Sequence, residues 1–179
     1  MRPNLKPLFI GILAAALVLP ALAGPAPVAA KSLMETSLSK ATKEKKNVLL
    51  IFHASWCGWC KRMDAMLESP QFKATFEKNF VITHVDVQER GSQKTLENEG
   101  GNELMARYGG ETAGLPFFVI LSPKGTKIGD SFLANKQNMG FPSETEEVTT
   151  FMALMKKTAP RMSDTDLTTL ETFLRNPKK

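Results

Sequence analysis

Two stretches decide the fold of this chain: VLLIF at Val48–Phe52 and, three residues later, WCGWC at Trp56–Cys60. A run of five apolar residues that includes β-branched ones is typical of a strand buried on both faces of a mostly parallel sheet. The sequence from Gly58 to Leu67 places its apolar side chains on one side of a helix, which Pro70 kinks or ends. The two cysteines therefore lie where a buried strand turns into a helix.

Further patterns extend this arrangement along the chain. They predict helices at 32–46, 71–79 and 103–108, strands at 80–87, 115–121 and 127–133, a polar surface connection at 89–101 and an irregular insertion at 134–142. Ser143 with Glu146 predicts a capping box for a helix that runs through Met155, and Ser163 with Asp166 predicts a second capped helix. This order of helices and strands indicates an α/β fold with one sheet between helices.

The N-terminus has the pattern of a secretory signal. Arg2 and Lys6 precede an apolar run at 8–19, and small residues follow it. We expect residues 1–23 to be a signal peptide cut after Ala23, residues 24–31 a flexible leader and residues 32–179 the folded domain; cleavage after Ala30 stays open. The run is shorter than the roughly 20 residues that span a bilayer. We therefore expect the mature chain to have no membrane span and to be periplasmic or secreted.

Size and charge restrict the function further. The chain has 179 residues and 42% hydrophobic content, which suits a single domain with its own core. Lys and Arg number 23 against 18 Asp and Glu, and basic and acidic residues alternate, as at 43–46. Such mixed faces are typical of solvated surface, not of a phosphate-binding stripe, so we expect no nucleic-acid partner.

The position of the cysteines predicts their chemistry. The first turn of a helix presents unpaired backbone N–H groups and the positive end of the helix dipole, and both favour a thiolate. We therefore expect Cys57 to be the catalytic nucleophile and Cys60 to be the catalytic thiol that resolves a mixed disulfide formed at Cys57. Trp56 and Trp59 surround the sulfurs with apolar surface on which a flexible protein partner can bind.

These residues resemble the thioredoxin-like superfamily. The resemblance rests on WCGWC after a buried strand and on the run Gly114–Phe118, GLPFF, before a Pro-Lys-Gly hairpin, and it covers roughly residues 47–133. It implies a thioredoxin-like fold, with a central mixed sheet of about four strands flanked by helices. It also implies that Pro116 is cis and lies against the cysteine pair, and that Leu115 offers backbone groups to a substrate strand.

Two departures from the thioredoxins proper affect what the resemblance implies. Ile51 stands where those proteins keep a buried acid that assists proton movement at the second cysteine. The residues between the cysteines are Gly58 and Trp59 instead of Gly-Pro. Because this dipeptide helps to set the redox potential, a strongly reducing potential is not carried over.

Three alternatives to redox catalysis remain open. A purely structural disulfide would close a loop of only four residues and would therefore remove little chain entropy. Two cysteines with His53 and His84 could hold copper or zinc in a periplasmic metal chaperone, although their spacing matches no metal motif. The chain could also be a non-catalytic thioredoxin-fold binding module. We interpret His53 as a satisfied strand-end residue, His84 as structural and Asp86 as a strand-end cap, and we assign no metal ligand and no cofactor.

The sequence thus predicts an exported enzyme, a thiol-disulfide oxidoreductase. It would exchange disulfides with protein thiols through Cys57 and Cys60, with a separate protein as electron donor or acceptor. The resemblance to thioredoxins, and not to oxidases with a large helical insertion, favours the reductase direction.

Overall fold

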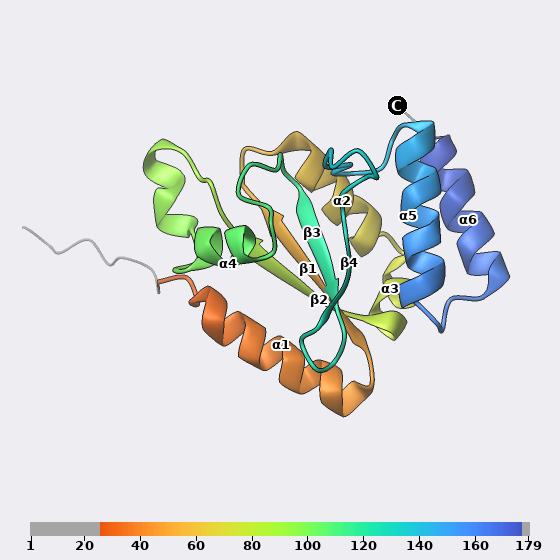
Figure 1. The fold of residues 1–179 in the computed structure, drawn as a ribbon, viewed down its shortest axis with the longest axis horizontal. Coiled ribbons are helices and arrows are strands. Elements are labelled where there is room, and N and C mark those ends of the chain that lie inside the picture. Colours follow the sequence, from red (N-terminus) through yellow and green to blue (C-terminus); the bar gives the residue numbers. More distant parts are fainter. Residues whose placement is uncertain (1–25, 177–179) are drawn as a thin grey trace, which may run out of the picture.

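The computed structural model describes residues 26–176 (Figure 1). The signal peptide expected at 1–23, with its cleavage point after Ala23, lies outside these residues. Within the part of the chain that is described, no helix is long and apolar enough to cross a membrane.

One mixed sheet forms the centre of the molecule. Its strand order is β2-β1-β3-β4, with β1 and β2 parallel, β3 antiparallel to β1 and β4 antiparallel to β3. This confirms the predicted mixed sheet of about four strands flanked by helices. The elements, in chain order, are α1 (Ala30–Glu44), β1 (Asn47–His53), α2 (Gly58–Glu68), α3 (Lys73–Asn79), β2 (Phe80–Asp86), the 3-10 helix η1 (Gly91–Leu96), α4 (Gly101–Arg107), β3 (Phe117–Leu121), β4 (Lys127–Asp130), α5 (Thr145–Thr158) and α6 (Asp164–Arg175).

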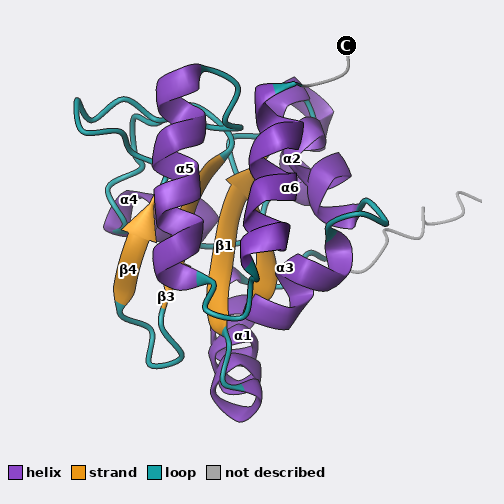
Figure 2. Ribbon diagram, turned by 90° about the vertical axis from the view of Figure 1, so that its right-hand side faces the viewer, coloured by secondary structure: helices purple, strands orange, loops and turns teal. Residues whose placement is uncertain are grey.

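Each face of the sheet is covered by its own hydrophobic core. Leu49 and Ile51 of β1 pack with residues of α2, α3, α5 and α6. The alternate β1 residues Val48, Leu50 and Phe52 pack with residues of α1 and α4 on the other face. Figure 2 shows α2, α5 and α6 in front of the sheet and α1 beneath its lower end. Because side chains alternate between the two faces of a strand, the apolar run in β1 supplies both cores.

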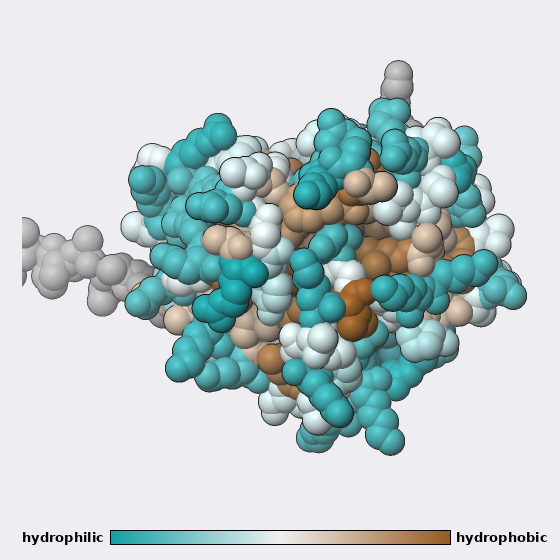
Figure 3. Space-filling view, viewed as in Figure 1, coloured by the Kyte–Doolittle hydropathy of each residue, from teal (hydrophilic) through white to brown (hydrophobic). Residues whose placement is uncertain are grey.

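The edge strand β4 is only partly covered. Its residues Ile128 and Gly129 lie under α5, where Leu154 packs so closely on Gly129 that a Cβ there would collide with it. In the view of Figure 3 the surface is mostly hydrophilic, and apolar residues gather between β4 and α5.

The first helix starts earlier than predicted. Ala30 is its first residue, and it is buried, so residues 30 and 31 do not belong to a flexible leader. The N–H of Ala30 donates to the carbonyl of Glu99 at 2.8 Å, and the side-chain amide of Asn98 donates to the carbonyl of Val28 at 2.8 Å. These contacts attach the start of the domain to the 89–101 connection.

Other expected boundaries are also corrected. The 89–101 connection is not all surface, because Glu89 and Asn98 are buried. Strand β3 begins at Phe117 and not at Leu115, since Pro116 has no N–H to contribute to the ladder. Strand β4 ends at Asp130 and not at residue 133, because the Asp130 carboxylate accepts the N–H of Phe132 and bends the chain.

The two capping predictions have different outcomes. Ser163 and Asp166 form the predicted capping box of α6, with the Asp166 N–H donating to Ser163 Oγ at 3.1 Å. At α5 the predicted box of Ser143 with Glu146 is wrong by one residue. The N-cap is Glu144, and its N–H donates to the carboxylate of Glu147 at 2.9 Å.

We expect Ser163→Ala to lower the free energy of unfolding by about 1 kcal/mol, because it removes an N-cap acceptor. Ser143→Ala is the matched control and should cost clearly less, since Ser143 is not an N-cap residue. Urea unfolding followed by circular dichroism measures both. Equal losses in the two variants would contradict the assigned helix starts.

Candidate active site at Cys57 and Cys60

The two cysteines form a disulfide at the start of α2. Cys57 is the N-cap residue, and the N–H of Cys60 donates to its Sγ at 3.1 Å. The N–H of Cys57 donates in turn to the carbonyl of Ala54 at 3.0 Å, which closes the turn between β1 and α2. Both cysteines are almost fully buried, with 3% and 1% of their surface exposed. A thiolate at Cys57 would therefore receive a helix N-terminal N–H, as the sequence predicted.

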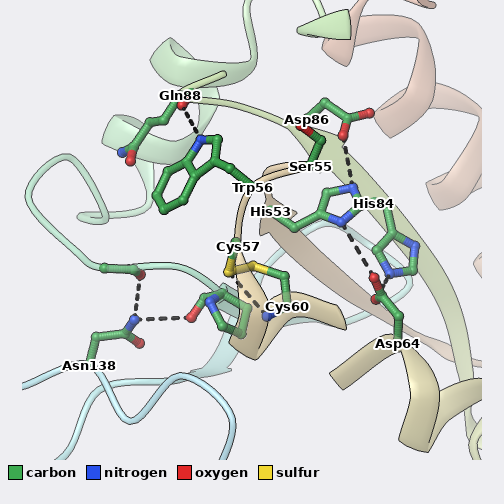
Figure 4. Close-up of a disulfide and its surroundings, with 12 residues drawn as sticks. His53, Ser55, Trp56, Cys57, Cys60, Asp64, His84, Asp86, Gln88 and Asn138 are labelled. Carbon is green, nitrogen blue, oxygen red and sulfur yellow. Dashed lines mark hydrogen bonds and ion pairs between the residues drawn. A yellow bond between two sulfur atoms is a disulfide. The ribbon is translucent and has the colours of Figure 1, made fainter. Parts of the chain in front are cut away.

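The two tryptophans that precede the cysteines in the sequence are exposed. Trp56 is 40% and Trp59 47% exposed, in contrast to the buried cysteines. The Trp56 indole N–H donates to the carbonyl of Gln88 at 2.8 Å, and the Arg90 guanidinium lies 3.7 Å from the centre of its ring. Figure 4 shows Trp56 held above the disulfide by this hydrogen bond.

Trp59 is held by stacking. Its ring lies nearly parallel to that of Phe141, with 6.2 Å between ring centres, and the Arg62 guanidinium is 5.2 Å from its centre. Phe141 belongs to the insertion at 134–142. This insertion therefore contributes to the surface beside the cysteines.

The peptide bond between Leu115 and Pro116 is cis, as the resemblance implied. Leu115 packs on the buried cluster of Ala54, Cys57 and Cys60. The side-chain amide of Asn138 donates to the carbonyls of Gly114 at 2.6 Å and of Pro116 at 3.0 Å. The sequence did not single out Asn138, because nothing local to the insertion indicates which carbonyls it reaches.

Glu89 is a second residue that the sequence missed. Its carboxylate accepts the N–H of Ser55 at 2.6 Å and the Ser55 hydroxyl at 2.7 Å, and only 3% of the residue is exposed. Ser55 directly precedes Trp56, so this buried carboxylate positions the turn that carries the cysteines. In the sequence Glu89 opens a polar stretch and has the appearance of a surface residue.

Two histidines and two aspartates meet beside α2 (Figure 4). His84 Nε2 lies 2.9 Å from Asp64 Oδ1, His53 Nδ1 lies 3.7 Å from Asp64 Oδ2, and His53 Nε2 lies 3.1 Å from Asp86 Oδ1. The parallel register pairs His53 with Asp86 and Ile51 with His84, which brings the rings to 4.8 Å between centres. Asp86 therefore faces His53 and is not a simple strand-end cap, and the two histidines are neighbours.

The charges in this group shift each other's pKa values. Burial alone would raise the pKa of Asp64, but its two histidine partners outweigh burial and hold this pKa well below its usual range. Burial would lower the pKa of His53, but the carboxylates of Asp64 and Asp86 raise it overall. His53, Asp64 and His84 offer ligand atoms within 4.8 Å of one another, so they are the described residues that could hold a metal ion. This arrangement contains neither cysteine.

The sheet order, together with a Cys-x-x-Cys disulfide at the start of the helix after β1, is that of the thioredoxin fold. Ile51 of β1 is buried in the hydrophobic core, at the position where the thioredoxins proper keep an acid. The chain belongs to the thioredoxin-like family, whose model matches residues 29–123. The resemblance predicted from the sequence is thereby confirmed.

Known proteins of similar sequence are named for disulfide chemistry. The chain is 29% identical over 108 residues to the disulfide bond reductase DsbH of Chlamydia pneumoniae, a match that covers 57% of this chain and 64% of that protein. It is 28% identical over 86 residues to a protein disulfide-isomerase of Hordeum vulgare, covering 48% of this chain and 14% of that protein. The matches thus span less than two thirds of either relative.

A solved structure supports the fold. The disulphide isomerase from Xylella fastidiosa Temecula1 superimposes with a TM-score of 0.51 at 20% sequence identity, over 82% of this chain and 92% of that one. At this identity the likeness concerns the fold alone.

We expect Cys57 to have the lower thiol pKa in the reduced protein, because its sulfur faces the N–H of Cys60 at the helix start. Limiting iodoacetamide near pH 7, followed by peptide mapping, should label Cys57 before Cys60. Preferential labelling of Cys60 would reverse the expected roles of the two thiols.

We expect Glu89→Ala to lower the free energy of unfolding by about 1–3 kcal/mol, since it leaves the N–H and the hydroxyl of Ser55 without their acceptor. Glu89→Gln retains one acceptor oxygen and should cost less. Denaturant unfolding of the oxidised protein measures both variants. Glu99→Ala, an exposed change in the same connection, is the comparison, and a loss as large as that of Glu89→Ala would contradict the assigned role.

Proposed function

We propose that this chain is an exported thiol-disulfide oxidoreductase that reduces disulfides of protein substrates through Cys57 and Cys60. The observation that carries the proposal is the hydrogen bond from the Cys60 N–H to Cys57 Sγ at the start of α2. A donor in this position stabilises a thiolate more than a thiol, and the thiolate is the form that attacks a disulfide.

The proposed reaction has two exchange steps. The Cys57 thiolate attacks one sulfur of the substrate disulfide, so that a mixed disulfide forms and the other substrate sulfur leaves as a thiolate. Cys60 then loses its proton and attacks Cys57 Sγ. The Cys57–Cys60 disulfide closes, and the second substrate sulfur leaves. Two electrons pass from the cysteine pair to the substrate, and a donor protein restores them in the same way.

Substrate would bind on the surface around the disulfide. Trp56 and Trp59 offer exposed apolar area next to the buried cysteines, and Leu115 packs on the cysteine pair. Arg62 and Arg90 place positive charge over the two indole rings. These features suit an extended protein segment with apolar side chains next to its cysteine.

Two observations favour the reductase direction and export. The similar protein from Chlamydia pneumoniae is named a disulfide bond reductase. The N-terminal sequence has the pattern of a cleaved signal peptide, which would deliver the domain to the periplasm or outside the cell. A reductase there needs a supply of electrons, because that compartment favours disulfides.

We expect Cys60→Ser to accumulate mixed disulfides with partner proteins, because attack by Cys57 can proceed while resolution cannot. Cys57→Ser is the matched control and should accumulate few. Both variants are expressed in the exporting host and compared on non-reducing gels. Absence of adducts from Cys60→Ser would contradict disulfide exchange at Cys57.

The same host, expressing the wild-type protein, serves to test the direction of electron flow. Alkylation of the wild-type protein with a bulky maleimide should find the two thiols reduced at steady state. A fully oxidised pair would contradict the reductase direction while leaving disulfide exchange intact.

A further inference from the structure

We propose that His53, Asp64 and His84 form a binding site for a divalent transition metal ion such as Zn²⁺, separate from the cysteine pair. Imidazole nitrogen with carboxylate oxygen is a donor set that zinc accepts in proteins, commonly as three protein ligands with a fourth position open. The proposal assigns a metal site to two histidines that the sequence indicated as structural, together with Asp64, which the sequence did not single out. It does not depend on the proposed disulfide chemistry.

The donor atoms are already near the required separations. A tetrahedral zinc ion with bonds of 2.0–2.2 Å holds its ligand atoms about 3.4 Å apart. In the structure Asp64 Oδ1 lies 2.9 Å from His84 Nε2, and Asp64 Oδ2 lies 3.7 Å from His53 Nδ1. These two separations lie on either side of the required value, and one ligand atom from each of the three residues lies within 4.8 Å of the others. The ligand atoms would therefore have to approach one another by at most about 1.4 Å to surround one ion.

Three different elements hold the donors in place. His53 is the last residue of β1, His84 lies on β2 and Asp64 lies on α2. The parallel register of β1 and β2 sets the distance between the two rings, and α2 presents Asp64 to both of them, as Figure 4 shows. Sites carried by strands and helices keep their geometry better than sites on loops.

In the described part of the chain, neither ring nitrogen of His53 makes a hydrogen bond, and the ring presents Nδ1 to Asp64 and Nε2 to Asp86. Among the described residues, its Nε2 is the buried side-chain nitrogen or oxygen that lacks a hydrogen bond, although Asp86 Oδ1 is 3.1 Å away. Its Nδ1, at 3.7 Å from Asp64, is too distant for a hydrogen bond. A ring with carboxylates on both sides, and a hydrogen bond to neither, suits a ligand whose Nδ1 takes a cation.

Asp86 would orient the His53 ring without binding the metal ion itself. Histidine ligands in metal sites commonly direct their second ring nitrogen toward a carboxylate, which orients the ring and strengthens it as a donor. Asp86 occupies this position next to His53 Nε2. Its own backbone N–H donates to Asn98 Oδ1 at 2.6 Å, which fixes this end of β2.

Charge and access also suit a dication. Asp64 and Asp86 carry two negative charges when ionised, and neutral imidazoles add none. The side chains of Asp64 and His84 are 34% and 33% exposed, so an ion and a water ligand can reach the group from solvent. The cysteines do not serve as ligands in this site, because their sulfurs are joined in a disulfide.

In the oxidised protein any metal binding can be tested without the cysteines, since the disulfide removes both thiolates as ligands. We expect the exported protein, purified without a tag and kept oxidised, to bind one equivalent of Zn²⁺ in isothermal titration calorimetry. His84→Gln and Asp64→Asn should each weaken binding at least tenfold. Glu68→Gln, an exposed change on the same helix, and the double variant Cys57→Ser/Cys60→Ser should bind like the wild type.

A second measurement does not depend on variants that might misfold. In ¹⁵N spectra of the histidine rings, Zn²⁺ should shift His53 Nδ1 and His84 Nε2 of the wild-type protein. Absence of binding to the oxidised protein would overturn the proposal, as would wild-type affinity in folded His84→Gln. Binding by the reduced protein alone, lost in the double cysteine variant, would assign the metal to the cysteines instead.

Discussion

The burial of β1 on both faces is the constraint on which the rest of the structure depends. The residues Val48–Phe52 are all nearly inaccessible, and they divide between the two cores that hold the helices to the sheet. A strand that is buried on both faces and paired on both edges cannot shift its register without exposing apolar side chains. Its end is therefore a fixed point, and the turn that follows places Cys57 at the start of α2.

Parallel pairing of β1 with β2 gathers titratable side chains at one edge of the sheet. The two strands end at the same edge, so His53 and Asp86 become neighbours next to the turn that carries the cysteines. The chain leaving β2 then places Glu89 under Ser55. Groups far apart in sequence thus meet where α2 starts, because parallel strands bring their carboxyl ends together.

The sequence predicted what is encoded locally. The apolar run of β1, the cysteine position and the Ser163 cap depend on neighbouring residues, and all three were found as expected. Glu89 and Asn138 were missed because their roles depend on partners that only the folded chain brings near. The same reason applies to His53 and His84. Their meeting depends on which strands pair with each other, and no residue next to either histidine indicates that β1 pairs with β2.

The contrast between buried sulfurs and exposed indoles has a thermodynamic consequence for any partner that binds on this face. Trp56 and Trp59 present large apolar surfaces, and burying such a ring contributes about 25 cal/mol for each Å² removed from water. Part of that gain is usually lost when a mobile side chain becomes ordered. Here the hydrogen bond of Trp56 to Gln88 and the stacking of Trp59 on Phe141 already restrain both rings. A partner would therefore meet a preorganised surface and retain more of the burial energy.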